Sequence, residues 1–162
     1  MAEVVDPRTA EALLARRRVA VAGASAGERS FATAVYRELR ERGYDVVAVN
    51  THARPVLGDP CYPDLCSVPG PVDWVLVMVP ADQAGRVVDD AIAASIPGVW
   101  FFKGLGPGAV SDDAVDHARR HGLTVVAGAC PLMFLQPVRG VHRAHRALRR
   151  LRGSLAPATP RA

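Results

Sequence analysis

The sequence predicts an α/β protein built on a single Rossmann-like, doubly wound parallel sheet. Short apolar runs of strand length alternate with segments of helical periodicity, which is the pattern of βαβ units. The length of 162 residues suits one domain with a well-buried core better than two. Five expected strands joined by right-handed crossovers then give the order 3-2-1-4-5. This order predicts a ligand crevice beyond the ends of the first and fourth strands.

Five apolar runs are the expected strands. They are residues 18–22, 45–49, 73–79, 98–102 and 123–126. The third run is apolar almost throughout, which is typical of a strand that is buried on both faces. The segment that precedes it is rich in Pro, Gly and Asp, so we expect a loop there with one short helix in residues 62–68.

Capping residues and helical spacing predict the first two helices. Asp6 and Pro7 are suited to the N-cap and first position of a leading helix that ends near residue 15. A second helix begins near Ser30 and ends at Gly43, where a left-handed residue is favoured. Its expected buried stripe consists of Phe31, Val35 and Leu39.

Two further helices and a basic end complete the expected organisation. One helix begins at Pro80, and its sheet-facing residues are Val87, Val88, Ala91 and Ile92. The next is capped by Ser111 and ends at Gly122. We expect residues 1–137 to form the domain, and residues 138–162 to form a basic helix followed by a flexible tail.

Charge and composition argue against several classes of function. The net charge of +4 reflects basic residues that crowd into 139–161, and no aromatic residues interleave with these arginines, which argues against nucleic-acid binding. No apolar run has the length of a membrane span and no signal peptide is recognisable, so we expect a cytoplasmic protein without a membrane contact. Cys61, Cys66 and Cys130 form no CxxC pair, and we expect reduced thiols without a zinc site.

The turn after the first strand is a candidate phosphate site. Residues 23–27 read Gly-Ala-Ser-Ala-Gly, and small residues let backbone N–H groups approach an anion at the start of a helix. The turn matches neither GxxxxGK[ST] nor GxGxxG, so it predicts neither an NTP-hydrolysing loop nor the usual dinucleotide fingerprint. A tight strand–helix turn without a ligand is the alternative.

The end of the second strand carries a sharper signal. An NAD site normally places Asp or Glu there, whereas this chain has Asn50, His52 and Arg54 and no carboxylate before Asp59. Neutral and cationic side chains favour a phosphorylated ribose, as in NADP or coenzyme A. In the alternative interpretation, Asn50 closes an Asx turn and Arg54 is a solvated loop residue.

These segments together resemble the stand-alone CoA-binding domain proteins, which are related to the nucleotide-binding domain of the succinyl-CoA synthetase α subunit. The matching segments lie in residues 17–137 and are "VAVAGAS", "GYDVVAVN", "LGDPCYPDL", "PVDWVLVMVPAD", "GVWFFKG" and "GLTVVAGACPLMF". The later "RGVHRAHRALRR" is similar to the His/Arg-rich end of one branch of these proteins. Lys103 and the "AGAC" that ends at Cys130 depart from the residues common in the family.

The resemblance implies a Rossmann-type domain that holds CoA, and it assigns the site by position. The resemblance implies phosphate contacts with Gly23, Ala24, Ser25 and Ser30. The ribose and its phosphate would lie near Asn50, His52 and Arg54. The adenine would be flanked by Val79, Pro80 and Ala81. The pantetheine or diphosphate would be covered by Lys103 and Gly104.

No catalytic or metal site is expected. The synthetase relatives carry their phosphorylated histidine on a separate domain, and we expect no histidine here to have a nearby carboxylate partner in a Ser/His/Asp or Cys/His arrangement. Cys130 is either a buried structural thiol or a thiol close to bound CoA. We therefore expect non-catalytic binding of CoA or an acyl-CoA, with an NADP-dependent oxidoreductase or another nucleotide-using enzyme as the alternative. The nucleotide is the expected partner, and apolar residues 130–138 are a candidate contact for a protein partner or a second copy.

Overall fold

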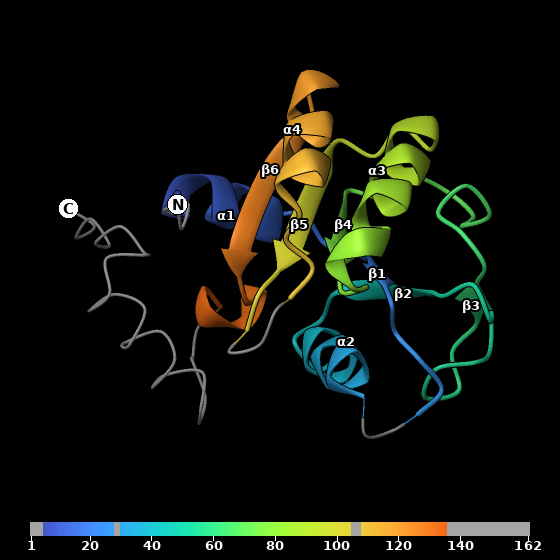
Figure 1. The fold of residues 1–162 in the computed structure, drawn as a ribbon. Helices are drawn as coiled ribbons and strands as arrows, with labels where there is room; N and C mark the ends of the chain where they lie inside the picture. The colour runs from blue at the N-terminus through green and yellow to red at the C-terminus, as the bar shows by residue number, and fades with distance from the viewer. Residues whose placement is uncertain (1–4, 28–29, 105–107, 136–162) are drawn as a thin grey trace.

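The computed structural model describes residues 5–27, 30–104 and 108–135, and shows a parallel sheet with helices on both faces (Figure 1). The sheet has six strands in the order β3-β2-β1-β4-β5-β6. They are β1 (Arg18–Ala22), β2 (Asp45–Val49), β3 (Cys61–Tyr62), β4 (Trp74–Val77), β5 (Gly98–Phe102) and β6 (Thr124–Ala129). The expected Rossmann-like α/β class is confirmed, with six strands in place of five.

The additional strand changes where one expected strand lies. β3 has only two residues and pairs with Ala48 and Val49 of β2, so it takes the third place in the order. The strand expected third, at residues 73–79, is β4, and it pairs with β1 on one side and β5 on the other. All four residues of β4 are buried, which a central position explains and an edge position would not. The neighbour of β1 at the crevice is therefore β4 rather than Gly98–Phe102.

The helices begin and end close to their expected boundaries. They are α1 (Pro7–Leu14), α2 (Phe31–Glu41), α3 (Ala84–Ala93) and α4 (Asp112–Arg120), with single 3₁₀ turns at Ala81–Gln83 and Pro131–Met133. The carboxylate of Asp6 accepts from the N–H groups of Arg8 and Thr9, and the Ser111 hydroxyl accepts from the N–H of Ala114. Gly43 and Gly122 follow their helices with positive φ, as expected.

Two local expectations are wrong. Residues 62–68 form turns after β3 and no helix, because Pro63 follows the strand directly and the Asp64 carboxylate accepts from the N–H of Ser67. Phe31 is 53% exposed, whereas Val35 and Leu39 are buried. Phe31 is the first residue of α2, and helical side chains lean toward the N-terminus, so its ring extends past the start of the helix.

The strands bury alternate residues in two apolar layers, one on each face of the sheet. Val19 and Val21 of β1 pack in the layer that also contains the buried residues of α1 and α2. Ala20 and Ala22 pack in the layer that contains those of α3 and α4. Trp74 and Trp100 stack in the first layer with ring centroids 5.9 Å apart. Helices therefore cover both faces, which leaves the ends of the strands for ligands.

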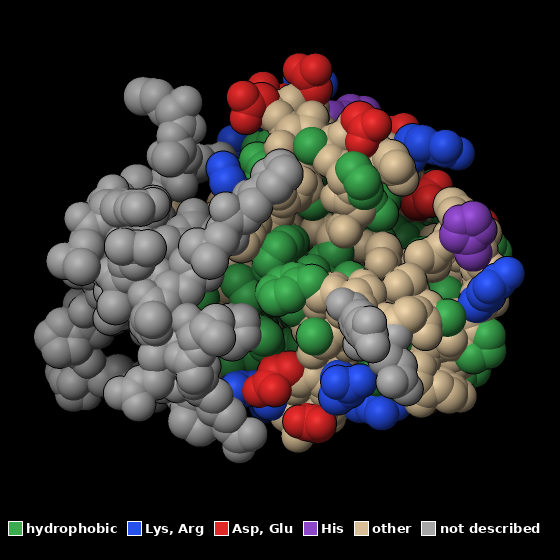
Figure 2. Space-filling view, turned by 60° about the horizontal axis from the view of Figure 1, so that its bottom comes forward, with side chains coloured by type: hydrophobic (Ala, Val, Ile, Leu, Met, Phe, Trp, Pro, Cys, Tyr) green, Lys and Arg blue, Asp and Glu red, His purple; other side chains and the backbone are tan. Residues whose placement is uncertain are grey.

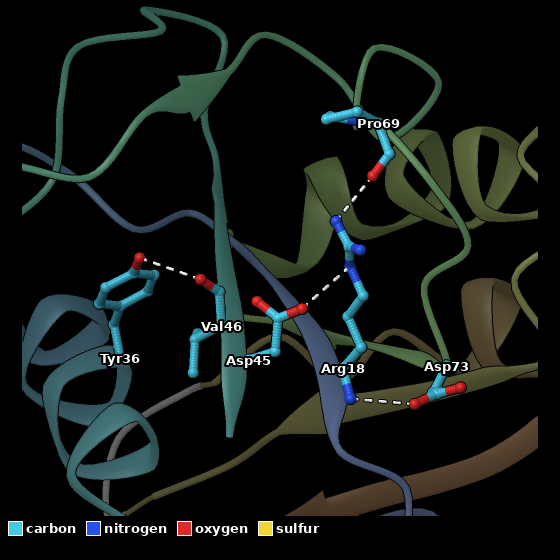
Figure 3. A network of polar contacts seen from close by, with 6 residues as sticks. All are labelled: Arg18, Tyr36, Asp45, Val46, Pro69 and Asp73. Carbon is cyan, nitrogen blue, oxygen red and sulfur yellow. Dashed lines mark hydrogen bonds and ion pairs between the residues drawn. The ribbon is translucent and has the colours of Figure 1, made fainter. Parts of the chain in front are cut away.

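Polar contacts fix the amino ends of β1, β2 and β4 (Figure 3). The Arg18 guanidinium donates to the Pro69 carbonyl at 2.6 Å, and the Arg18 backbone N–H donates to the Asp73 carboxylate at 2.9 Å. Arg18 Nε also lies 3.5 Å from Asp45 Oδ2, which is an ion-pair distance without hydrogen-bond geometry. This network stabilises the end of the sheet opposite the expected crevice.

The expected basic helix and tail at residues 138–162, and the domain boundary at 137, lie outside the described residues. Among the described helices, none has both the length and the apolar character that a membrane crossing requires.

Candidate functional site

The turn after β1 passes very close to the end of β4. Gly23 has a φ of +105°, and its backbone N–H donates to the Val49 carbonyl at the end of β2. A Cβ atom at Gly23 would lie 2.9 Å from the Met78 carbonyl carbon and 3.0 Å from its oxygen. Only glycine fits this position, because the φ is positive and because the Met78 backbone leaves no space for a Cβ atom. The turn is thus held between the carboxyl ends of β2 and β4.

A pocket of about 360 Å³ opens beside this turn, between the loops that follow β1 and β2. It is lined by Ala24, Ser25, Ala26, Gly27, Asn50, His52 and Arg54. Five of these seven are predicted site residues. Among the described residues no carboxylate lines the pocket, and the charged and titratable side chains that line it there are one guanidinium and one imidazole. A neutral-to-cationic pocket of this kind suits an anion.

Asn50 joins the two loops that form the pocket. Its side-chain N–H donates to the Ala24 carbonyl at 2.9 Å, and its side-chain oxygen accepts from the His52 backbone N–H at 3.0 Å. The second contact is the Asx turn of the alternative interpretation. Both functional atoms of the amide are thus engaged within the protein, so Asn50 shapes the pocket wall.

Thr33 fixes the other wall, and the sequence analysis did not single it out. Its hydroxyl donates to the Ser25 carbonyl at 2.8 Å and lies 3.4 Å from the Ser25 backbone nitrogen. Thr33 is 1% exposed, the one buried polar side chain among the described residues. A threonine in the first turn of an amphipathic helix was the available signal, because it interrupts the apolar stripe with a hydroxyl.

The helix α2 begins beside the pocket. The Ser30 backbone N–H donates to the carbonyl of Gly27, a lining residue, at 3.0 Å. The Ser30 side chain makes no capping hydrogen bond, so its hydroxyl does not satisfy the first N–H groups of the helix. The positive end of the α2 dipole therefore lies next to the small-residue turn.

His52 and Arg54 lie on the loop after β2, and both are exposed. The structure shows no ion pair between Arg54 and any described residue. Between them, Ala53 adopts a left-handed φ of +46° and donates its N–H to the Asn50 carbonyl at 2.8 Å. This tight turn brings both side chains to the pocket, and it leaves the guanidinium available for a ligand.

The remaining predicted residues follow other strands. Val79, Pro80 and Ala81 come after β4, and a Cβ atom on Gly23 would lie 3.1 Å from the Val79 backbone nitrogen. Lys103 and Gly104 come after β5, one strand farther from Gly23 than expected. All of them lie at the carboxyl-end side of the sheet, and none lines the pocket.

The face at the carboxyl ends is divided by side-chain type (Figure 2). Hydrophobic side chains gather near its centre, whereas acidic and basic side chains lie toward its margins. At the carboxyl end of β5 the Phe102 ring stacks with the Phe31 ring of α2, with centroids 5.3 Å apart. Phe102 is the last residue of β5. The sequence analysis assigned no role to this aromatic pair.

Within the described residues, no thiol lines the pocket, and His52 is the one histidine that does. Burial raises the pKa of the Cys61 thiol, which disfavours its thiolate, and Cys130 is 1% exposed. His117 of α4 has a carboxylate partner, because its Nε2 lies 2.8 Å from Asp89 Oδ1 of α3. That pair lies between two helices, away from the pocket residues. The described residues contain no group of three metal-ligating side chains.

Comparisons with known proteins agree with this architecture. Residues 17–136 match the model of a family described as a CoA binding domain. The chain is 31% identical over 126 residues to an acetate–CoA ligase (ADP-forming) from Archaeoglobus fulgidus, a match that covers 74% of this chain and 18% of the ligase. The chain thus corresponds to less than a fifth of that relative's length.

Smaller proteins match over most of their length. The uncharacterized protein YneT from Bacillus subtilis is 27% identical over 120 residues, covering 74% of this chain and 86% of YneT. A solved structure of a hypothetical protein from Pyrococcus horikoshii is 28% identical with a TM-score of 0.75, covering 86% of this chain and 96% of that one. The family match spans most of the chain and includes every element from β1 to the turn at Pro131–Met133. The chain therefore belongs to the family of CoA-binding domains.

Proposed function

We propose that this protein binds CoA or an acyl-CoA without catalysing a reaction, through the pocket at the carboxyl ends of β1 and β2. The observation that carries the proposal is the set of groups around that pocket. A turn of small residues, the start of α2, and the side chains of His52 and Arg54 surround it, and no carboxylate of the described residues lines it. These groups suit the several phosphate groups of CoA.

Within the site, we assign Arg54 to the phosphate on the ribose of CoA. Arg54 follows the second strand, where dinucleotide-binding proteins recognise the ribose. Its guanidinium has no ion pair within the described residues, and the left-handed turn at Ala53 brings it to the pocket. The turn at residues 23–27, with Ser30, would then contact the diphosphate. Val79, Pro80 and Ala81 would flank the adenine, and Lys103 and Gly104 would lie nearest the pantetheine.

Two observations support binding without catalysis. The described side chains that line the pocket include no thiol or carboxylate, and the hydroxyl of Ser25 has no adjacent base among them other than His52. The carboxylate-paired histidine, His117, lies on α4 and not at the pocket. A serine–histidine–carboxylate arrangement is thus not assembled by the described residues.

The test is calorimetric titration with CoA, dephospho-CoA and NADPH. We expect CoA to bind more tightly than dephospho-CoA, which lacks the ribose phosphate. Arg54→Ala should weaken CoA binding by about 10- to 100-fold, the range for losing a charge-assisted hydrogen bond. The same substitution should leave dephospho-CoA binding nearly unchanged. Arg86→Ala, which replaces an arginine of α3 away from the pocket, is the matched control and should change neither.

Each other outcome has a defined meaning. Equal affinity of the unmodified protein for CoA and dephospho-CoA would contradict the assignment of Arg54. Binding of NADPH without any binding of CoA would overturn the proposed function and favour the oxidoreductase alternative.

A further inference from the structure

Phe31 differs from the other large hydrophobic side chains of the described residues. It is 53% exposed, and the other large hydrophobic side chains in the described residues are buried or partly buried. It is also not a solitary surface residue, because its ring packs on Phe102 with centroids 5.3 Å apart. The two rings come from the start of α2 and the end of β5. Phe31 therefore supplies nearly all of the apolar surface that the two rings expose at this carboxyl-end side of the sheet, because Phe102, against which it packs, is only 9% exposed.

The backbone around Phe102 holds its ring in this position. The pairing of β5 with β6 shifts register between Phe101 and Phe102, an irregularity that re-aims the side chain. A Cβ atom at Gly104 would lie 3.1 Å from the end of the Phe102 ring. A Cβ atom at Gly108 would lie 2.7 Å from the Phe102 carbonyl oxygen, and its φ is +71°. The backbone at each of these two glycines thus approaches Phe102 closely.

Phe31 lies close to the pocket along the chain. Phe31 directly follows Ser30, whose N–H is bonded to Gly27, and Gly27 lines the pocket. A ligand with a charged head in the pocket and an apolar end would thus meet both surfaces. From this we infer that Phe31, supported by Phe102, contacts the acyl group of a CoA thioester, so that the protein prefers acyl-CoA with an alkyl chain over free CoA. This inference rests on the proposed function.

The size of the exposed surface favours an acyl chain over a protein partner. A complete aromatic side chain contributes about 150–250 Å² when it is buried, and Phe31 is already half buried. A stable protein interface needs about 800 Å² from each partner. Within the described residues no further large exposed hydrophobic side chain extends the surface. Its extent therefore matches a short alkyl chain.

The experiment is a calorimetric series with CoA, acetyl-CoA, butyryl-CoA and hexanoyl-CoA. Affinity should rise by about two- to fourfold for each methylene added beyond acetyl. Phe31→Ser should abolish this dependence on chain length while retaining the affinity for free CoA. Phe31→Leu, which keeps an apolar side chain, should restore most of it. Thermal unfolding of both variants checks that they fold, which the exposure of Phe31 leads us to expect.

The outcomes separate the inference from the proposed function. No binding of CoA or any thioester by the unmodified protein would overturn both. Binding of CoA with no rise along the series, or with an equal rise in Phe31→Ser, would overturn the acyl contact alone. A dimer in size-exclusion chromatography that Phe31→Ser dissociates, together with a flat series, would also overturn it and assign the surface to a second copy.

Discussion

The side-chain amide of Asn50 donates to the Ala24 carbonyl at 2.9 Å and so joins the loops after β2 and β1. The same side chain accepts from the His52 N–H. Asn50→Ala removes both contacts, so we expect it to lower the free energy of unfolding by about 1–3 kcal/mol. CoA affinity should fall as well, because the His52 and Arg54 loop loses its attachment. Chemical denaturation and calorimetry measure the two effects.

Asn50→Asp is the control for this prediction. Aspartate keeps an acceptor for the His52 N–H but has no donor for the Ala24 carbonyl, and it places a negative charge at the pocket wall. We expect CoA affinity to fall further than in Asn50→Ala, because the added charge repels phosphate. Stronger binding by the aspartate variant would contradict an anion site.

Gly23→Ala should destabilise the fold by about 2–4 kcal/mol. A left-handed φ costs alanine about 1–2 kcal/mol, and the added Cβ would also press on the Met78 carbonyl. Gly43→Ala is the matched control, since Gly43 has a φ of +82° with open space around it. Its loss should be about 1 kcal/mol in the same denaturation experiment. Equal losses at the two positions would show that the contact with the end of β4 is unimportant.

Thr33→Val replaces the buried hydroxyl by a methyl group of similar volume. The Ser25 carbonyl loses its donor, so we expect a loss of about 1–2 kcal/mol in stability. CoA binding should weaken too, since Ser25 lines the pocket. Thr33→Ser keeps the hydroxyl and should bind CoA as the unmodified protein does. Identical CoA affinity in the valine and serine variants would contradict a role for this hydrogen bond in the site.

The pKa of Asp90 on α3 is raised, first by burial and then by the nearby Asp64 carboxylate. A carboxyl group with a raised pKa favours folding when protonated, and this contribution is lost as the pH rises from its unfolded to its folded pKa. Asp90→Asn should therefore raise the melting temperature at pH 7. The difference should vanish in acid, below the ordinary aspartate pKa of about 3.9. Thermal unfolding at the two pH values measures this, and an equal gain at both would contradict it.

The sequence was sufficient to predict the bounds of a strand where one physical signal dominates. β1, β2 and β5 have the expected bounds, because each is a short apolar run set off by flanking charged or turn-forming residues. β3 was missed, since two residues in a proline-rich loop carry no periodicity and pair only because β2 offers its edge. The place of β4 was wrong for the same reason.

The site was predictable in part. The small-residue turn and the lack of a carboxylate after β2 located the loops that enclose the pocket. The hydrogen bond from Thr33 to Ser25 and the stacking of Phe31 on Phe102 depend on contacts between separate segments of the chain, which helical spacing does not reveal. The four-residue spacing of apolar residues even assigned Phe31 to the core. Such spacing identifies which face of a helix is apolar, but it does not show how far the helix extends past the sheet.

The Tyr36 hydroxyl affects whether another molecule can pair a strand with the edge of this sheet. Its O–H donates to the Asp59 carboxylate at 2.8 Å, its oxygen lies 3.1 Å from the Val46 carbonyl oxygen and so covers that carbonyl, and burial raises the pKa of Tyr36 so that it keeps its proton. Just beyond the two residues of β3, this carbonyl would otherwise be free to recruit a foreign strand. Aggregation by edge-to-edge growth of the sheet is thereby discouraged on this side, without a long protective strand.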